Sequence, residues 1–291
     1  MTSHLAPRDI QGYRDDGYLF PIDIFTEQEA QILRARLEAV EATHGDRSDF
    51  PHQLSQYQRV NAHVVLPMAN ELAHNPLILD AVESLLGPDL LIWSCEFFIK
   101  EPHTDHIVSW HQDLTYWGLG ETDEEITAWL ALSPVTTQSG CMNFVAGSHR
   151  NRIVAHNDTF ADNNLLSRGQ ELAVDVDEDD AVHVELKPGQ LSLHHGRMFH
   201  GSGPNRSSDR RIGMAIRYIT PDVQQHVAPH DYAMLARGQD RNGHFRLIEG
   251  PKSDFAPEAL ALYDEMLATQ SLALAEGAEQ DVGLYSSGPA N

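Results

Sequence analysis

The pattern of hydrophobic and polar positions divides the chain into a helical first part and a strand-rich second part. Apolar residues recur at helical spacing over residues 26–42, and Thr26 with Glu29 has the pattern of a capping box. A second apolar stripe over residues 70–86 predicts another helix, which a Gly-Pro pair ends. Beyond it, short apolar runs are separated by glycine and proline, as is typical of strands joined by turns.

Seven strand-like runs follow the second helix, with no long helix between them. This spacing favours a sandwich or a barrel. We therefore expect a mainly β fold with flanking helices, in which a double-stranded β-helix (a cupin-like jelly roll) carries the N-terminal helices packed on it. The expected strands cover residues 90–100, 107–111, 126–135, 141–145, 181–186, 190–194 and 212–219.

The domain organisation is expected to be simple, because neither an internal repeat nor an interdomain linker is visible over residues 1–291. Residues 157–180 are polar and acidic, and fit either a lid over a site or a solvated surface loop. The expected parts are a helical support (1–88), a jelly-roll core (89–222), a C-terminal extension (223–275) that includes a helix over 257–275, and a flexible tail (276–291).

Charge and cysteine content exclude several kinds of partner. The chain has 43 acidic and 20 basic residues, a formal net charge of −23. Nucleic acids and anionic membranes need a basic surface, so we expect neither as a partner. No apolar run approaches the roughly 18 residues of a membrane span, and the N-terminus shows no apolar signal region. With Cys95 and Cys141 expected to be buried reduced thiols, the sequence predicts a cytoplasmic protein of unspecified oligomeric state.

The candidate chemistry begins with histidine and aspartate two residues apart. Positions i and i+2 of a strand point to the same face, so such a pair could bind one metal ion. Two imidazoles and one carboxylate leave open positions on the metal and suit non-haem Fe(II) oxygen chemistry. Four pairs fit the pattern: His44/Asp46, His103/Asp105, His111/Asp113 and His156/Asp158.

The surroundings of His111 and Asp113 distinguish this pair, since Trp110, Tyr116 and Trp117 would make a dry pocket beside a metal. A third ligand could come from a late strand. His200 precedes a glycine-rich turn and is one candidate for this ligand. His194 and His195 are the others, or they would instead orient a metal ligand or the substrate as pocket walls.

A candidate anion site follows eleven residues after His200, at Arg211. In the strand expected there, Arg211 shares a face with Gly213 and Ala215, and small neighbours would leave room for an anion beside the guanidinium. An arginine fork suits the far carboxylate of a 2-oxoacid. Arg210 would point the other way, into solvent.

These motifs in combination resemble those of the phytanoyl-CoA dioxygenase family, which includes enzymes like ectoine hydroxylase. The resemblance runs from about Leu90 to Ile219. The matching segments are Trp-His-Gln-Asp at 110–113, Trp129, Ser-Gly-Cys-Met-Asn-Phe-Val-Ala-Gly-Ser-His at 139–149, Pro-Gly at 188–189, His-Gly-Ser at 200–202, and Arg211.

The resemblance implies a metal site and an activity. Fe(II) would be bound by His111, Asp113 and His200, which the family's spacing selects over the other candidates. With O2 and 2-oxoglutarate, the enzyme would hydroxylate an aliphatic C–H bond and release succinate and CO2. Related carrier-dependent halogenases have a small residue in place of the metal carboxylate, so Asp113 implies hydroxylation or another oxidation such as desaturation.

The resemblance also implies how 2-oxoglutarate is held. Its keto acid end would chelate the iron, and its other carboxylate would pair with Arg211 and hydrogen-bond to Ser202. Gln112 and Trp129 would lie along it.

The substrate is predicted only as a class, a small-molecule metabolite or a natural-product intermediate. An acidic protein with aromatic candidates in its pocket suggests a neutral or cationic molecule, such as an amino acid derivative or a quaternary amine. Two other classes remain open: a cupin-like metal enzyme without redox chemistry, such as an isomerase or epimerase, and a jelly-roll binding module without catalysis. Candidate substrate residues are Phe98, Lys100, Trp110, Tyr116, Trp117, Met142, Asn143, His194 and His195.

Overall fold

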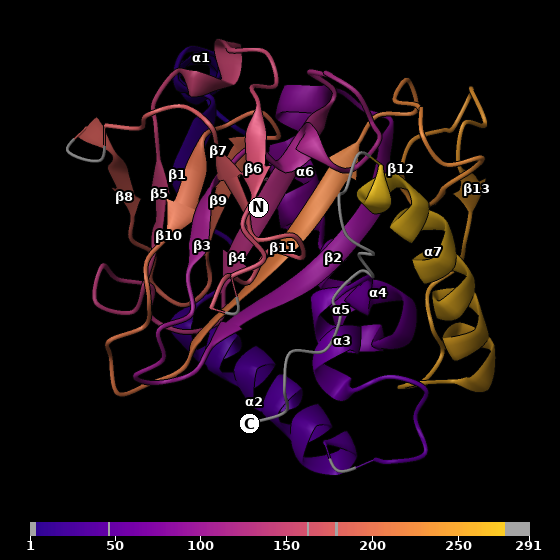
Figure 1. Cartoon of the computed structure of the whole chain (residues 1–291). Helices are drawn as coiled ribbons and strands as arrows, with labels where there is room; N and C mark the ends of the chain where they lie inside the picture. The colour runs from indigo at the N-terminus through magenta and orange to yellow at the C-terminus, as the bar shows by residue number, and fades with distance from the viewer. Residues whose placement is uncertain (1–3, 46, 162, 178–179, 277–291) are drawn as a thin grey trace.

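Two largely antiparallel sheets form the centre of the computed structural model, which describes residues 4–45, 47–161, 163–177 and 180–276. The larger sheet has the order β1-β9-β4-β11-β2-β12-β13, the smaller β3-β10-β5-β8, and β6 pairs with β7 (Figure 1). The predicted jelly-roll fold is thus confirmed. The strands are β1 Tyr18–Asp23, β2 Leu90–Lys100, β3 Val108–His111, β4 Glu125–Ala131, β5 Met142–Phe144, β6 His156–Asp158, β7 Gln170–Leu172, β8 Val182–Val184, β9 Gln190–His195, β10 His200–Ser202, β11 Arg211–Ile219, β12 Tyr232–Arg237 and β13 Arg246–Leu247.

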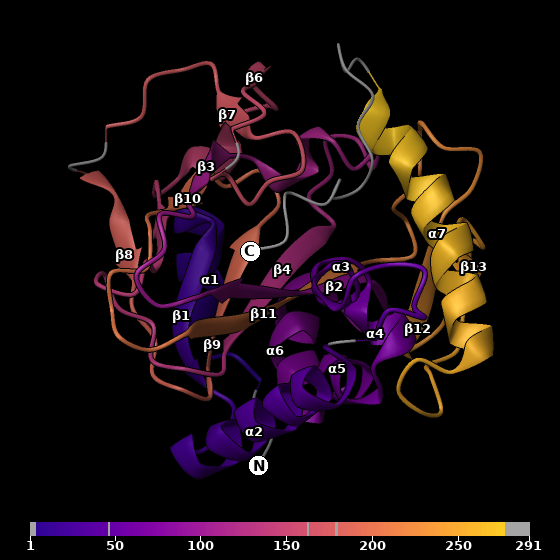
Figure 2. The same ribbon diagram turned by 60° about the horizontal axis from the view of Figure 1, so that its bottom comes forward.

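The helices surround the large sheet on one side and at one edge. Helices α2 to α6 gather on the side away from the small sheet, and α7 runs along the edge formed by β12 and β13 (Figures 1 and 2). No helix among the described residues is long and apolar enough to cross a membrane. The helices are α1 Pro7–Asp16, α2 Glu27–His44, α3 Leu54–Arg59, α4 Ala62–Val65, α5 Pro67–Ala73, α6 Pro76–Leu86 and α7 Pro257–Ala275.

The helix starting after Thr26 has the predicted capping box. The Thr26 hydroxyl accepts from the Glu29 backbone N–H at 3.2 Å, and the Glu29 carboxylate accepts from the Thr26 N–H at 2.8 Å. Two backbone donors that the first helical turn leaves without partners are therefore satisfied, which is why α2 begins here.

The single helix expected over residues 70–86 was wrong, since the chain forms α5 and α6 with a break between them. Pro76 has no N–H to donate, and its ring would collide with the carbonyl four residues earlier in a continuous helix. Asn75 instead caps a new helix, its side chain accepting from the Leu77 N–H at 2.9 Å. A proline at the first position then starts α6.

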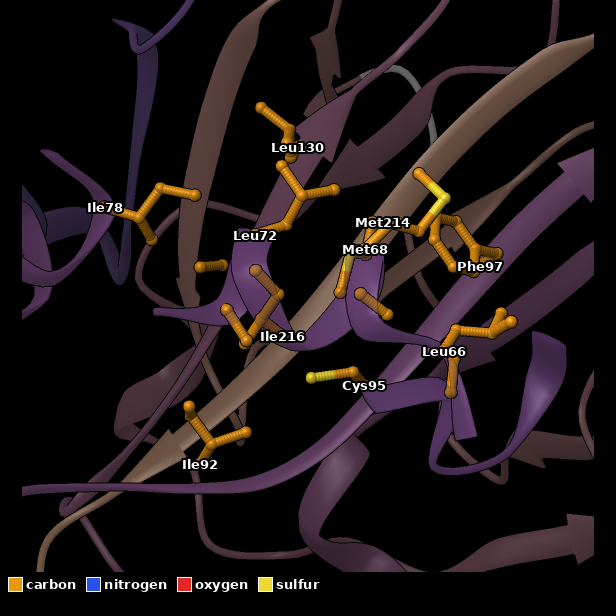
Figure 3. Packing of buried hydrophobic residues seen from close by; sticks show 14 of the residues in the cluster. Leu66, Met68, Leu72, Ile78, Ile92, Cys95, Phe97, Leu130, Met214 and Ile216 are labelled. Atoms are coloured by element: carbon orange, nitrogen blue, oxygen red, sulfur yellow. The ribbon is translucent and has the colours of Figure 1, made fainter. Parts of the chain in front are cut away.

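The main core lies between these helices and the large sheet (Figure 3). Along β11, alternate side chains such as Met214 and Ile216 face the helices, while Arg211, Gly213, Ala215 and Arg217 face the small sheet. The large sheet thus has one apolar face and one that is rich in polar groups, and the second face forms a wall of the site. The core residues labelled in Figure 3 are Leu66, Met68, Leu72, Ile78, Ile92, Cys95, Phe97, Leu130, Met214 and Ile216.

Several elements differ from the expected ones at their ends or were not predicted. The strand expected over 126–135 ends at Ala131, and Val135 forms only an isolated bridge with Leu186. The helix over 257–275 is confirmed. The expected tail, 276–291, lies outside the described residues except for Glu276. Elements without a prediction are α1, β1, α3, α4, β6, β7, β12 and β13, of which β6 and β7 lie at the two ends of a stretch of the segment expected to be a loop.

Candidate active site

A cluster of two histidines and one aspartate lies where β3 and β10 pair. His111 ends β3 and is the register partner of His200, which begins β10. Asp113 begins the 3-10 turn Asp113–Thr115 directly after β3, so the expectation that it lies on the strand is corrected. One potential ligand atom from each of the three buried residues lies within 4.8 Å of the others. This is the one such group among the residues that the structure describes.

The ring nitrogens of the two histidines are oriented by backbone carbonyls. Nδ1 of His111 lies 2.9 Å from the Ser109 carbonyl, and Nδ1 of His200 lies 3.0 Å from the Met198 carbonyl. A carbonyl only accepts, so each Nδ1 carries the proton and each Nε2 keeps its lone pair. Both Nε2 atoms approach Oδ1 of Asp113, at 3.3 Å and 3.8 Å. Burial, and then the repulsion that a protonated His111 would exert, hold the pKa of His200 well below its usual value, which favours the neutral, metal-binding form.

The second oxygen of Asp113 is held from the opposite side by Thr127. The Thr127 hydroxyl lies 3.1 Å from Oδ2 of Asp113 and 3.1 Å from Oε1 of Glu125. One hydroxyl proton cannot be donated to both carboxylates. Burial and then the charge of Asp113 raise the pKa of the fully buried Glu125 well above its usual value. A protonated Glu125 can donate to Thr127, which leaves the Thr127 proton for Asp113.

The competing histidines and the other His-x-Asp pairs are not members of this cluster. His194 is buried beside it, but its Nε2 is 3.6 Å from Oδ2 of Asp113, beyond hydrogen-bond distance. His195 lies 3.1 Å from Asp123 and does not line the cavity. Asp158 pairs with Arg168. His103 and Asp105 are exposed, and Asp46 lies outside the described residues.

At the other end of the same cavity wall lies Arg211, which is 1% exposed. Its Nε and one Nη have no hydrogen-bond partner among the described residues. Burial and then the charge of Arg59 lower the pKa of Arg211 to about 10, so the guanidinium stays protonated near neutral pH. A buried cation with unmatched donors is costly unless an anion completes it.

The space next to Arg211 is filled differently from the expectation. The Trp129 ring lies 5.4 Å below the guanidinium carbon. A Cβ atom built on Gly213 would come within 1.9 Å of that ring. Gly213 therefore makes room for Trp129 rather than for an anion.

Lys100 lies beside Arg211 and contacts Ser202, which lines the cavity. Lys100 is the register partner of Arg211 on β2. Its side-chain nitrogen Nζ donates to the Ser202 hydroxyl at 2.7 Å and to the Gly203 carbonyl. Burial and then the charge of Arg211 lower the pKa of Lys100 to about 5. Since the Ser202 oxygen accepts from Lys100, its own proton remains available for an anion at Arg211.

Gln112 lies in the cavity wall, but both ends of its amide are engaged. Its Nε2 donates to the carbonyls of Arg152 at 3.2 Å and Arg197 at 3.0 Å, and its Oε1 accepts from the Val154 N–H at 2.9 Å. The side chain thus connects two loops, and these bonds leave no amide N–H of Gln112 for the predicted contact with a cosubstrate.

The candidate substrate residues divide into two groups. Phe98, Tyr116, Trp117, Met142 and His194 line the cavity with the metal cluster and Arg211. Trp110 and Asn143 instead line a separate hollow on the other side of β3 and β10.

Arg210 is not solvated as expected. Its guanidinium lies 2.8 Å from Glu41 and 2.9 Å from Glu101, and the side chain is 20% exposed. It joins α2 to the large sheet on the side away from the cavity.

Several residues of the cavity wall were not identified from the sequence. Thr127 and Glu96 precede Trp129 and Phe98 by two positions, and Arg217 follows Arg211 by six, so strand alternation could have placed all three on the inner face. Asn61 and Gln270 lie on elements far apart in the chain, and no sequence pattern indicates that they meet.

Comparison with known proteins identifies similar proteins over the part of the chain that contains the metal cluster and Arg211. The model of the phytanoyl-CoA dioxygenase family matches residues 13–213. A probable phytanoyl-CoA dioxygenase of Caenorhabditis elegans is 27% identical over 167 residues, which cover 55% of this chain and 54% of that protein. The chain therefore spans about half the length of this relative.

Other relatives match over nearly the whole chain. A probable alpha-ketoglutarate-dependent hypophosphite dioxygenase of Stutzerimonas stutzeri is 23% identical over 283 residues, covering 91% of this chain and 96% of that protein. Among solved structures, the apo form of the non-haem monooxygenase ThoJ superposes with a TM-score of 0.79 at 36% identity, covering 92% of this chain and 97% of the other.

Proposed function

The chain belongs to the phytanoyl-CoA dioxygenase family, and from this premise we propose that it is an Fe(II)- and 2-oxoglutarate-dependent dioxygenase acting on an aliphatic C–H bond of a small molecule. The resemblance inferred from its motifs is thereby confirmed. The observation that carries the proposal is one cavity lined by a three-residue metal cluster and by a buried arginine with unmatched donors.

The residues present fit both groups that such an enzyme needs. Two neutral imidazoles and one carboxylate, within 4.8 Å of each other, suit Fe(II) and leave its other positions open. Arg211 and Ser202 offer donors to a carboxylate at the other end. When bound, Fe(II) and 2-oxoglutarate supply the oxidising chemistry, with O2 as oxidant and succinate and CO2 as coproducts.

The protein's own contribution is to bind, orient and exclude water. The Ser109 and Met198 carbonyls hold the two imidazoles, and Thr127 holds the carboxylate of Asp113. Phe98, Trp117 and Trp129 supply apolar wall, which strengthens electrostatic interactions in the cavity. A carboxylate at Asp113 favours hydroxylation or desaturation over chlorination.

An anaerobic titration with Fe(II) and then 2-oxoglutarate tests the proposal. We expect a visible metal-to-ligand charge-transfer band in the natural protein and none in His200→Ala. Arg211→Ala should need at least tenfold more 2-oxoglutarate for the same band, because the charge-assisted pair is lost. Arg210→Ala is the matched control, since Arg210 pairs with Glu41 and Glu101 outside the cavity. Stoichiometric metal binding without a band would reject the proposal and favour a cupin-like metal enzyme without redox chemistry.

A further inference from the structure

The part of the cavity beyond the metal cluster is completed by residues outside the family match. That match ends at residue 213, whereas Arg217 of β11 and Gln270, Ala273 and Leu274 of α7 all line the cavity. The C-terminal extension therefore forms a wall of the cavity. Because a shared fold does not determine substrate chemistry, the side chains of this wall bear on which substrate binds.

A fully buried carboxylate, Asp231, fixes the orientation of the side chains behind this wall. The indole N–H of Trp93, which can only donate, lies 2.8 Å from Oδ2 of Asp231. The Tyr232 backbone N–H donates to Oδ1 at 2.8 Å, and the Gln225 amide donates to Oδ2 at 3.1 Å. Asp231 is therefore an acceptor toward all its neighbours.

This determines which atom of Asn61 is left without a partner. Gln270 turns its amide nitrogen to Asp231, at 3.1 Å, so its oxygen faces Asn61 at 2.7 Å. An oxygen accepts, and Asn61 must therefore present its nitrogen to Gln270. The remaining Oδ1 of Asn61 is buried in a residue that is 1% exposed, and it has no partner among the described residues.

A second acceptor without a partner lies in the same cavity wall, on Glu96. One carboxylate oxygen lies 3.0 Å from the Arg217 guanidinium, which also covers the Trp117 ring at 4.6 Å. The other oxygen is buried and has no partner among the described residues. Since Arg217 balances the charge of Glu96, the pair offers acceptor capacity without net charge.

Resting on the function proposed above, we infer that the substrate presents a neutral N–H or O–H donor, such as a carboxamide, to Asn61 Oδ1 and Glu96 Oε2. Buried acceptors left unmatched cost free energy, so a group that completes them gains affinity over one that cannot. Gln270 and Asp231 act as positioning residues, because they hold the Asn61 oxygen toward the cavity. A quaternary amine, which has no donor, does not satisfy these acceptors.

Three amides of graded donor content test the inference: acetamide, N-methylacetamide and N,N-dimethylacetamide. Their dissociation constants would be measured by saturation-transfer NMR on the full chain, with and without Fe(II) and 2-oxoglutarate under anaerobic conditions. We expect acetamide to bind about tenfold more tightly than N,N-dimethylacetamide, with N-methylacetamide between them. The order should hold in both forms, because the acceptors belong to the protein.

Variants show whether the amides bind in the cavity or elsewhere on the protein. Asn61→Leu should reduce the difference in affinity among the three amides, because only Glu96 Oε2 remains as an acceptor. Gln270→Met should reduce the difference less, because it only frees the Asn61 amide to turn. Asn143→Leu, a substitution in the separate hollow, should leave the order of the three affinities unchanged. The charge-transfer band of each variant reports an intact metal site. Equal or reversed affinities in the natural protein, or no detectable binding of acetamide, would overturn the inference. Failure of the band in the natural protein would instead reject the proposed function.

Discussion

At the scale of single residues, the site depends on where a few protons lie. The two imidazoles are held as acceptors at Nε2 because backbone carbonyls occupy Nδ1, and one oxygen of Asp113 is held by the only proton of Thr127. Such outer hydrogen bonds orient metal ligands and raise metal affinity. The Thr127 contact is therefore as much a part of the metal site as the ligands themselves.

Replacing Thr127 by valine keeps the shape of the side chain and removes its proton. We expect the affinity for Fe(II) to fall about tenfold, because Oδ2 of Asp113 would be buried without its donor. Isothermal titration with Fe(II) under anaerobic conditions measures this. Thr127→Ser, which keeps the hydroxyl, is the matched control and should bind Fe(II) as tightly as the natural protein. Equal affinities in the valine and serine variants would show that the Thr127 hydroxyl does not support the carboxylate.

The sequence predicted residues of the site where chemistry and spacing agree, and failed where partners come from distant segments. His111, Asp113 and His200 come together as the motifs indicate. Asn61, Gln270 and Asp231 are linked by hydrogen bonds, although Asn61 and Gln270 are 209 residues apart in the sequence. No local sequence pattern can reveal such a contact.

At the scale of elements, strands were easier to predict than short helices. Strands β2 and β11 are buried on both faces and consist largely of apolar and β-branched or aromatic residues, so they were expected almost over their full lengths. The break between α5 and α6 depends on Asn75 and Pro76, whose local geometry overrides a continuous apolar stripe. The short helices α3 and α4 have too few turns for a periodic pattern to show.

The segment 157–180 contributes to the cavity wall rather than only to the surface. Leu166, Ser167 and Gln170 line the cavity, and Arg168, 3% exposed, ties this segment to the end of α7. The Arg168 guanidinium donates to the Leu274 and Glu276 carbonyls at 3.0 Å and 3.1 Å. A cation there also interacts favourably with the negative end of the helix dipole.

Removing this link should loosen both elements together. In Arg168→Ala, we expect amide hydrogen exchange to become at least tenfold faster in β6, β7 and the last turn of α7, because the shared side chain is lost. Hydrogen exchange with mass spectrometry measures each segment. Arg152→Ala is the control, since Arg152 is 87% exposed and pairs only at the surface with Glu121. Unchanged exchange in all three elements would show that they are held independently of Arg168.

At the scale of the whole molecule, net charge describes the surface and not the cavity. The chain carries −23, yet two arginines, Arg211 and Arg217, line the cavity. An argument from overall acidity toward a cationic substrate therefore does not apply to the site. Local burial and pairing decide which ligands the cavity accepts.

Acid stability should depend on a histidine in the core. His63 is fully buried, and burial followed by the charge of His74 lowers its pKa to about 3. In the unfolded chain the pKa is about 6.5, so between these values only the unfolded state binds the proton. Stability is therefore lost as pH falls below 6.5, by about 1.4 kcal/mol per pH unit from this residue.

His63→Leu removes this dependence. Urea unfolding between pH 6 and pH 4 should show a slope of free energy against pH that is smaller by about 1.4 kcal/mol per unit than in the natural protein. His106→Leu, at an exposed histidine, is the control and should leave the slope unchanged. The same slope in both variants would show that His63 is not a source of acid sensitivity.

The buried, ligand-free anion site at Arg211 should lower the free energy of unfolding of the whole molecule. Arg211 is buried as a cation with two unmatched donor groups among the described residues, and the Trp129 ring, 5.4 Å from the guanidinium carbon, offsets only part of its desolvation. We expect Arg211→Met to raise the free energy of unfolding of the ligand-free protein by about 1–3 kcal/mol, because an uncompensated polar group leaves the interior.

The natural protein with Fe(II) should gain about 2.7 kcal/mol when 2-oxoglutarate is added at a hundred times its dissociation constant. Arg211→Met should gain far less at that concentration, and Arg210→Met should lose stability, because it leaves Glu41 and Glu101 without their partner. Thermal and urea unfolding with and without ligand measure both effects, and a destabilised Arg211→Met in the ligand-free state would show that the arginine is already satisfied within the protein.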